Sequence, residues 1–203
     1  MKWKPSRRFY RGCFRLARVL LGVVYRFEMI GRENIPSGAA MICSNHSSLI
    51  DPVFIALACG IKYNPHFIAK AELYKVPVLS AVITKLGAIS VDREMKDVAT
   101  IKSILQCFKN GEKVVIFPEG TRNPRGEKIT SKLGAVKIAE RTGVPLIPMY
   151  VPRKKRLFSK MPMVIGEPYN IVKESGKRSA EEYALLTEDL MGRIEALKPV
   201  NVK

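Results

Sequence analysis

Hydrophobic and polar positions follow two different periods along this chain, one typical of strands and one typical of helices. Short apolar runs predict strands over residues 25–30, 39–43, 66–69, 87–93, 114–117, 145–151 and 163–165. Apolar positions spaced three and four apart predict helices over residues 7–24, 52–59, 77–86, 95–108 and 131–142, and a last helix that a Ser179–Glu182 capping box begins. Strands and helices alternate along the chain, which predicts an α/β fold.

The first thirty residues differ from the rest and are expected to form a separate segment, followed by one domain over residues 31–203. In a helical projection of residues 7–24, one side gathers the apolar residues Phe9, Cys13, Leu16, Ala17, Leu20, Leu21 and Val24. The opposite side gathers Arg7, Arg8, Arg11, Arg15 and Arg18. The longest uncharged run, residues 19–25, is far shorter than the roughly 20 residues that a membrane span needs. We therefore expect an amphipathic helix lying in a membrane interface; the alternative is a surface helix packed on the domain.

The net charge of the chain indicates the class of its binding partner but does not identify the partner. The 203 residues include 35 basic and 18 acidic ones, for a net charge of +17. Such an excess indicates a polyanionic partner: nucleic acid, an anionic membrane or a phosphorylated substrate. The four cysteines (Cys13, Cys43, Cys59 and Cys107) lie in apolar runs without metal-ligand spacing, so we expect reduced thiols and no metal site. A basic run over residues 153–156 is interpreted as a solvated loop.

Candidate chemistry is concentrated in residues 44–52, directly after a predicted strand. His46 and Asp51 are five positions apart, a spacing that would separate their side chains on a continuous helix. They meet only if the chain turns between them, and Ser47 and Ser48 suit a turn. Asp51 and Pro52 then read as the N-cap and first residue of a helix. A His–Asp pair without a nucleophile suits deprotonation of a substrate hydroxyl. Taken alone, the same residues also fit a polar turn and a helix cap.

Two stretches together resemble the glycerolipid acyltransferase family. The pattern Asn45-His46-x-Ser48-x-x-Asp51 is similar to the family's first motif, and residues 117–122 are similar to its phosphate-binding motif. Residues 67–73, 87–93 and 144–148 resemble further segments of the bacterial 1-acylglycerol-3-phosphate acyltransferases. This resemblance implies a mixed, mostly parallel sheet flanked by helices, preceded by a membrane-docking segment.

The resemblance also implies a reaction. An acyl group would pass from a thioester of coenzyme A or acyl carrier protein to the free hydroxyl of lysophosphatidic acid, giving phosphatidic acid. This step of phospholipid synthesis would take place at the cytoplasmic face of the cell membrane and would need no further cofactor. His46 would act as general base and Asp51 would orient it, with Asn45 and Ser48 as supporting motif residues. Another lysolipid acceptor stays open.

The remaining motif residues receive roles in binding. Arg93 and Arg122 would bind the acceptor's phosphate, because guanidinium presents a planar fork to oxyanions. Glu119, Gly120 and Thr121 complete that phosphate-binding motif. Glu119 is expected to orient Arg122 or to cap the turn, and Gly120 to let the backbone turn tightly.

Two groups of donors are candidates for the oxyanion of the intermediate: Lys70 and the backbone N–H groups near His46. His66 matches no motif position and is expected to be structural.

A second class of function, a non-catalytic basic module that binds nucleic acid or anionic lipid, also fits the charge. The chain lacks the interleaved aromatic and basic residues of single-strand binders, a helix-turn-helix pattern and zinc-finger spacing. We therefore expect no nucleic acid among the partners.

Overall fold

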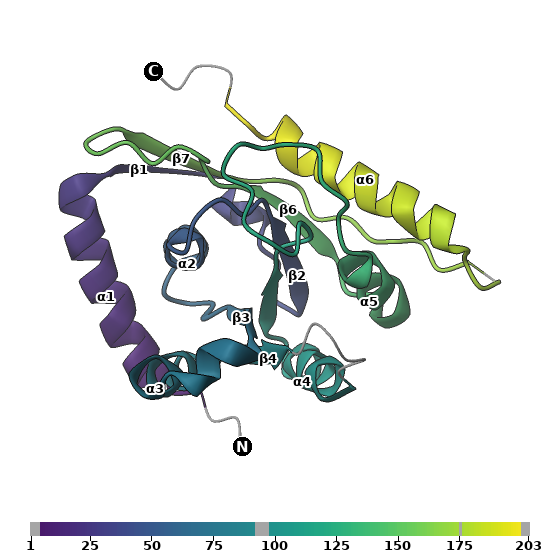
Figure 1. The fold of residues 1–203 in the computed structure, drawn as a ribbon, viewed down its shortest axis with the longest axis horizontal. Coiled ribbons are helices and arrows are strands. Elements are labelled where there is room, and N and C mark those ends of the chain that lie inside the picture. The colour runs from purple at the N-terminus through teal and green to yellow at the C-terminus, as the bar shows by residue number, and fades with distance from the viewer. Residues whose placement is uncertain (1–4, 92–97, 175, 200–203) are drawn as a thin grey trace.

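The fold is a seven-stranded sheet covered on both faces by helices (Figure 1). The computed structural model describes residues 5–91, 98–174 and 176–199. Its strands are β1 (Arg26–Ile30), β2 (Ala40–Ser44), β3 (His66–Lys70), β4 (Ile89–Val91), β5 (Lys113–Ile116), β6 (Leu146–Tyr150) and β7 (Lys160–Ile165). Its helices are α1 (Arg7–Val24), α2 (Asp51–Cys59), α3 (Pro77–Lys85), α4 (Val98–Lys109), α5 (Gly134–Thr142) and α6 (Ala180–Ala196), with short 3₁₀ helices η1 (Arg32–Asn34) and η2 (Ala71–Lys75).

The strand order confirms a mixed, mostly parallel sheet. Across the sheet the order is β1-β7-β6-β2-β5-β3-β4. The five strands from β6 to β4 are mutually parallel, whereas β7 runs antiparallel to β6 and pairs in parallel with β1. The carboxyl ends of those five strands therefore lie at one edge of the sheet, called the carboxyl edge below.

The central strand β2 is a continuous apolar run because both of its faces are buried. Met41 and Cys43 point into a core shared with α4, α5 and α6. Ala40 and Ile42 point into a second core shared with α2. All four side chains are buried, because helices cover both faces of the parallel sheet. The alternation of Cβ directions in a strand thus supplies two cores from one apolar run.

The first thirty residues are joined to the sheet and to α2. The expected boundary at residue 30 falls after β1, which pairs with β7 over its whole length. Helix α1 packs on α2 through Tyr10 and Phe14, which contact Leu57 in a third apolar cluster. No described helix combines the length and apolarity that crossing a bilayer requires.

Part of the apolar face of α1 stays uncovered. A stripe of four residues at helical spacing remains 58–74% exposed: Leu16, Val19, Leu20 and Val23. The five arginines of the helix are exposed as well. The helix therefore has one apolar strip that packs on the domain and another that does not.

The starts of α5 and β7 each differ from the predicted start by three residues. The helix expected from residue 131 begins at Gly134, after an irregular segment whose Lys132 N–H donates to Pro118 O at 2.7 Å. Strand β7 begins at Lys160, three residues before the expected strand. Pro162 obscured the strand in the sequence, but this proline lies beside the edge strand β1, where the register pairs it with Glu28.

Candidate active site

The residues of the two sequence motifs meet at the carboxyl edge. His46 follows β2 by two residues and Glu119 follows β5 by three. Because β2 and β5 are parallel neighbours, the turns after them lie side by side. Ligands of open α/β sheets bind in crevices outside these strand ends. The fold thus brings together motifs that are about seventy residues apart in sequence.

His46 and Asp51 form the predicted pair. The Nδ1 atom of His46 lies 2.9 Å from Oδ2 of Asp51. The same carboxylate oxygen accepts the backbone N–H groups of Ser47 at 2.6 Å and Ser48 at 2.7 Å. The Asp51 side chain is 1% exposed and the His46 ring 16%. A tight turn therefore wraps around a buried carboxylate and leaves the imidazole partly open to solvent.

The expectation that Asp51 caps α2 is wrong. Helix α2 begins at Asp51, and Ile50 occupies the N-cap position. The Asp51 carboxylate turns back toward the N–H groups of the preceding turn instead of capping the helix. Burial raises the pKa of this carboxyl, but hydrogen bonds from His46 and Lys155, the Lys155 charge and the Ser47 N–H outweigh burial and lower it. Asp51 is therefore held as an ionised acceptor.

Glu119 supports the backbone of His46. Its Oε2 accepts the His46 N–H at 2.8 Å, and its Oε1 lies 2.9 Å from a guanidinium nitrogen of Arg153. The partner of this buried carboxylate is thus Arg153, so the expected orientation of Arg122 by Glu119 is not observed among the described contacts. The His46 carbonyl in turn accepts the Asn123 N–H at 2.7 Å. Both backbone polar groups of His46 are fixed by the segment after β5.

The contacts of three other motif residues explain why each position carries the residue that it does. Phe117 stacks on the His46 ring, with centroids 4.0 Å apart. Gly120 has φ +67°, and a Cβ there would lie 2.9 Å from the Lys132 side chain, so the turn requires glycine. Asn45 is buried and bonds both the N–H and the carbonyl of Val151, at 2.9 and 2.8 Å. Asn45 thereby fastens the end of β2 to the end of β6.

The segment after β6 adds two residues that the sequence did not assign to the site. Lys155 Nζ lies 2.6 Å from Oδ1 of Asp51, and Arg153 pairs with Glu119. The interpretation of residues 153–156 as a solvated loop is therefore wrong for these two residues, whereas Lys154 and Arg156 are exposed. The alternation of inward and outward residues in an extended segment is the signal that could have found them.

Comparison with known proteins identifies the family of this chain. The acyltransferase family matches residues 26–152, which span both motifs and most of the sheet. The chain belongs to the acyltransferase family. A 1-acyl-sn-glycerol-3-phosphate acyltransferase of Bacillus subtilis (strain 168) is 35% identical over 197 residues, covering 93% of this chain and 96% of the relative. One of Pseudomonas aeruginosa is 34% identical over 137 residues, covering 66% of this chain and 51% of the relative.

A solved structure extends the comparison to the fold. The crystal structure of the 1-acyl-sn-glycerophosphate (LPA) acyltransferase PlsC from Thermotoga maritima matches with a TM-score of 0.68 at 29% identity. The match covers 97% of this chain and 81% of that one. The resemblance drawn from the motifs is confirmed, and so is the mixed, mostly parallel sheet flanked by helices that it implied.

Hydrogen bonds within the acyltransferase exclude some of the candidate oxyanion donors. The N–H groups of His46, Ser47 and Ser48 each already donate to a carboxylate, so these expected backbone donors are unavailable. Lys70, the other candidate, is exposed at the end of β3 on the carboxyl edge.

Of the expected phosphate ligands, Thr121 and Arg122 are exposed on the turn after β5. Arg93 lies outside the described residues.

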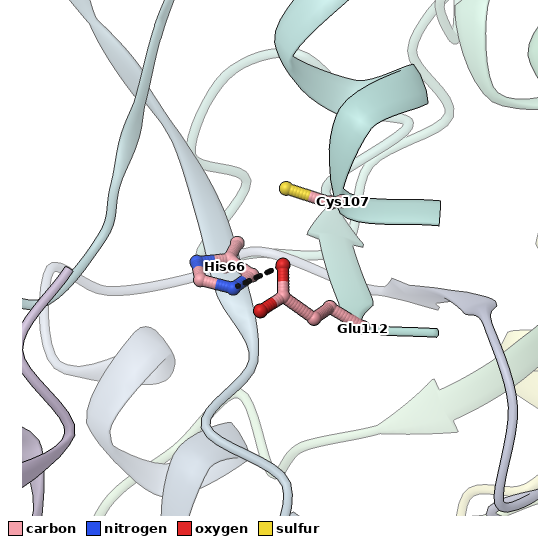
Figure 2. A group of neighbouring side chains, drawn as sticks. All are labelled: His66, Cys107 and Glu112. Carbon is pink, nitrogen blue, oxygen red and sulfur yellow. Dashed lines mark ion pairs between the residues drawn. The ribbon is translucent and has the colours of Figure 1, made fainter. Parts of the chain in front are cut away.

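The second histidine lies in a different environment. His66 begins β3, on the side of the sheet opposite the carboxyl edge, and is 1% exposed. Its side chain lies beside those of Cys107 and Glu112 (Figure 2). Its Nδ1 lies 2.9 Å from the Gly87 carbonyl, and its Nε2 lies 3.3 Å from a carboxylate oxygen of Glu112. Cys107 completes a group whose ligand atoms lie within 4.8 Å of one another. These three ligands are fewer than the four of structural zinc sites. The contact with Glu112 ties β3 to the turn before β5, and the contact with Gly87 ties it to the segment before β4.

Proposed function

We propose that this acyltransferase transfers an acyl group from a thioester of coenzyme A or acyl carrier protein to the free hydroxyl of lysophosphatidic acid. The observation that carries the proposal is the 2.9 Å contact between His46 Nδ1 and the buried carboxylate of Asp51. The relatives from Bacillus subtilis and Pseudomonas aeruginosa, both named 1-acyl-sn-glycerol-3-phosphate acyltransferases, support the acceptor. The product would be phosphatidic acid.

In the proposed step, His46 acts as general base through Nε2. Asp51 accepts the Nδ1–H, which fixes the tautomer and leaves the Nε2 lone pair to take the proton of the acceptor hydroxyl. The hydroxyl oxygen attacks the thioester carbonyl carbon, and the tetrahedral intermediate collapses as the carbon–sulfur bond breaks. The imidazolium returns its proton to the leaving thiolate. A positioned base of this kind contributes about 10²–10⁴-fold. The thioester is already activated, so the proposal includes no further cofactor.

Binding of the acceptor is assigned to the exposed end of the second motif. Arg122, with Arg93, would bind the phosphate through paired N–H donors, next to Gly120 and Thr121. Lys70 would supply positive charge to the developing oxyanion, because it ends the strand beside β5 on the same edge.

The same proposal places the enzyme on the cytoplasmic face of the membrane through α1. The exposed apolar stripe would enter the acyl boundary, and the neighbouring arginines would contact anionic headgroups. The loop before β7 extends this surface, because the Phe158 N–H donates to Val24 O at 2.8 Å, and Leu157 and Phe158 are both exposed. Each exposed cation near such a leaflet contributes about 1 kcal/mol.

A panel of acceptors tests the activity. Acyl-coenzyme A and acyl carrier protein thioesters are each incubated with lysophosphatidic acid, with other lysolipids and with an acceptor lacking phosphate, and free thiol release is followed. We expect release with lysophosphatidic acid and identification of phosphatidic acid by mass. Release only with another lysolipid would correct the acceptor. Binding of anionic vesicles without thiol release from either thioester would support the non-catalytic alternative.

A further inference from the structure

Lys155 is the least expected member of the site, because lysine is a long, flexible and usually solvated side chain. Here its side chain is only 8% exposed. Its Nζ lies 2.6 Å from Oδ1 of Asp51, 2.9 Å from Oγ of Ser47 and 2.9 Å from the carbonyl of Pro152. An ammonium group carries three N–H donors, and these three contacts use all of them. Lys155 therefore faces the protein and has no donor left for a substrate.

The two oxygens of Asp51 differ in their nearest partners, and the Ser47 hydroxyl lies 3.5 Å from both. Oδ2 receives the His46 ring and the two N–H groups of the turn, whereas Oδ1 receives Lys155. This division fixes the plane of the carboxylate and determines which oxygen faces the imidazole. An isolated carboxylate at this depth would be strongly disfavoured, so the ammonium also stabilises its ionised form.

We propose that Lys155 is a positioning residue for the acyl transfer, acting through Asp51 to orient the general base and to offset the negative charge beside it. The proposal rests on the proposed function of His46 and Asp51. A carboxylate beside an imidazole favours the imidazolium, and a cation on the far side of the carboxylate reduces that preference. The other charges at His46 are Glu119, which accepts its backbone N–H, and Arg153, which pairs with Glu119. Lys155 thus reduces the net negative charge behind a base that must be unprotonated to work.

The adjacent lysine provides a matched control. Lys154 carries the same charge on the same segment but is exposed. The full chain is compared as wild type, Lys155→Met, Lys155→Arg and Lys154→Met, with lysophosphatidic acid dispersed in detergent and thiol release as the readout. For Lys155→Met we expect kcat to fall by about tenfold to a hundredfold, with little change in the acceptor KM, because a misplaced base slows the chemical step. The acid limb of kcat/KM against pH should move to higher pH. Lys155→Arg should keep the wild-type acid limb, and Lys154→Met should match wild type throughout.

A double-mutant cycle with Asp51→Asn separates action through Asp51 from general support of the fold. If Lys155 acts through Asp51, Lys155→Met should cost little more activity in the Asp51→Asn background. Equal fold-losses in both backgrounds, or an acid limb that does not move in Lys155→Met, would overturn the proposal. If Lys155→Met does not fold, Lys155→Gln takes its place in the same comparisons. Absence of thiol release by the wild type would instead refute the proposed function, so the two failures are distinguishable.

Discussion

The carboxyl edge and the exposed apolar stripe of α1 both depart from the usual distribution of side chains. The first buries charged groups, and the second exposes apolar ones. In most folded proteins charged groups are exposed and apolar groups are buried. The carboxyl edge buries two carboxylates, Asp51 and Glu119, whereas α1 exposes a stripe that includes Leu20 and Val23. Buried charge and exposed contiguous apolar surface are the two observations that most often mark function.

The two regions differ in where their partners come from. Each buried carboxylate has a cation supplied by the segment after β6, Lys155 for Asp51 and Arg153 for Glu119. The site's charges are therefore compensated within the chain before any substrate binds. The α1 stripe has no such cover within the described part of the chain. We infer that its partner is external, and that the two regions will respond differently to substitution.

The largest effect is expected from Asp51→Asn, which removes the carboxylate charge that Lys155 compensates. The amide would present N–H groups to a network built for a carboxylate and would leave the Lys155 ammonium without its anion. We expect turnover to fall by about 10²–10⁴-fold, as when a histidine base loses the group that orients it. The measurement is kcat for thiol release with lysophosphatidic acid, with thermal unfolding as a check of folding. A folded variant that keeps half of the wild-type kcat would contradict the account.

A smaller effect is expected from Arg122→Lys, at the exposed end of the same motif. Lysine keeps the charge but loses the planar fork, so the acceptor KM should rise by roughly tenfold while the donor KM changes much less. Arg125→Lys is the matched control, since Arg125 is an exposed arginine on the same loop that pairs with Glu127. An equal loss with an acceptor that lacks phosphate would show that Arg122 does not bind the phosphate.

The α1 stripe should determine membrane association with little effect on the chemistry. Substituting Leu20→Glu together with Val23→Glu should reduce cosedimentation with anionic vesicles several-fold, because two apolar side chains leave the acyl boundary. Leu21 is avoided, since it packs against two apolar clusters of the domain. Leu185→Glu, a similarly exposed leucine on α6, should leave vesicle binding unchanged. Equal binding by the double variant and wild type would show that another surface docks.

The smallest effect is expected at His66, a buried group away from both regions. Burial lowers the pKa of this histidine, with the Gly87 carbonyl and Glu112 opposing the shift and Arg7 adding to it. The unfolded chain binds a proton near pH 6.5 and the folded chain does so only at lower pH, so stability should fall as the pH drops below about 6.5. His66→Gln should flatten this dependence between pH 7 and 5 in denaturant unfolding. An unchanged slope would show that other groups cause it.

The sequence predicted those parts of the site that depend on local geometry. Ser47 and Ser48 indicate a turn, and a turn is what brings His46 to Asp51. The strands of the sheet could be predicted for a similar reason. The apolar pattern of a strand such as β2 lies entirely within its own residues. Local patterns could not, however, show that the N–H groups of the turn would already be bound by carboxylates.

The residues that the sequence missed depend on strand order. Lys155 and Ser47 are 108 residues apart and meet because β6 lies beside β2 in the sheet. A run of four basic residues reads as a solvated loop until the positions of the buried carboxylates are known. Lys155 and Arg153 thus meet their carboxylates only because β6 lies parallel to β2. No single segment of the sequence contains that information.

The central claim is that His46 is the general base of the acyl transfer, and a comparison of the two histidines tests it directly. Thiol release with lysophosphatidic acid is measured for purified, folded His46→Ala and His66→Gln beside wild type. His46→Ala should retain less than about a hundredth of wild-type turnover while still binding lysolipid, because a positioned base contributes at least about 10²-fold. His66→Gln should stay within a few-fold of wild type. A folded His46→Ala variant that retains more than about a tenth of wild-type turnover would contradict the account.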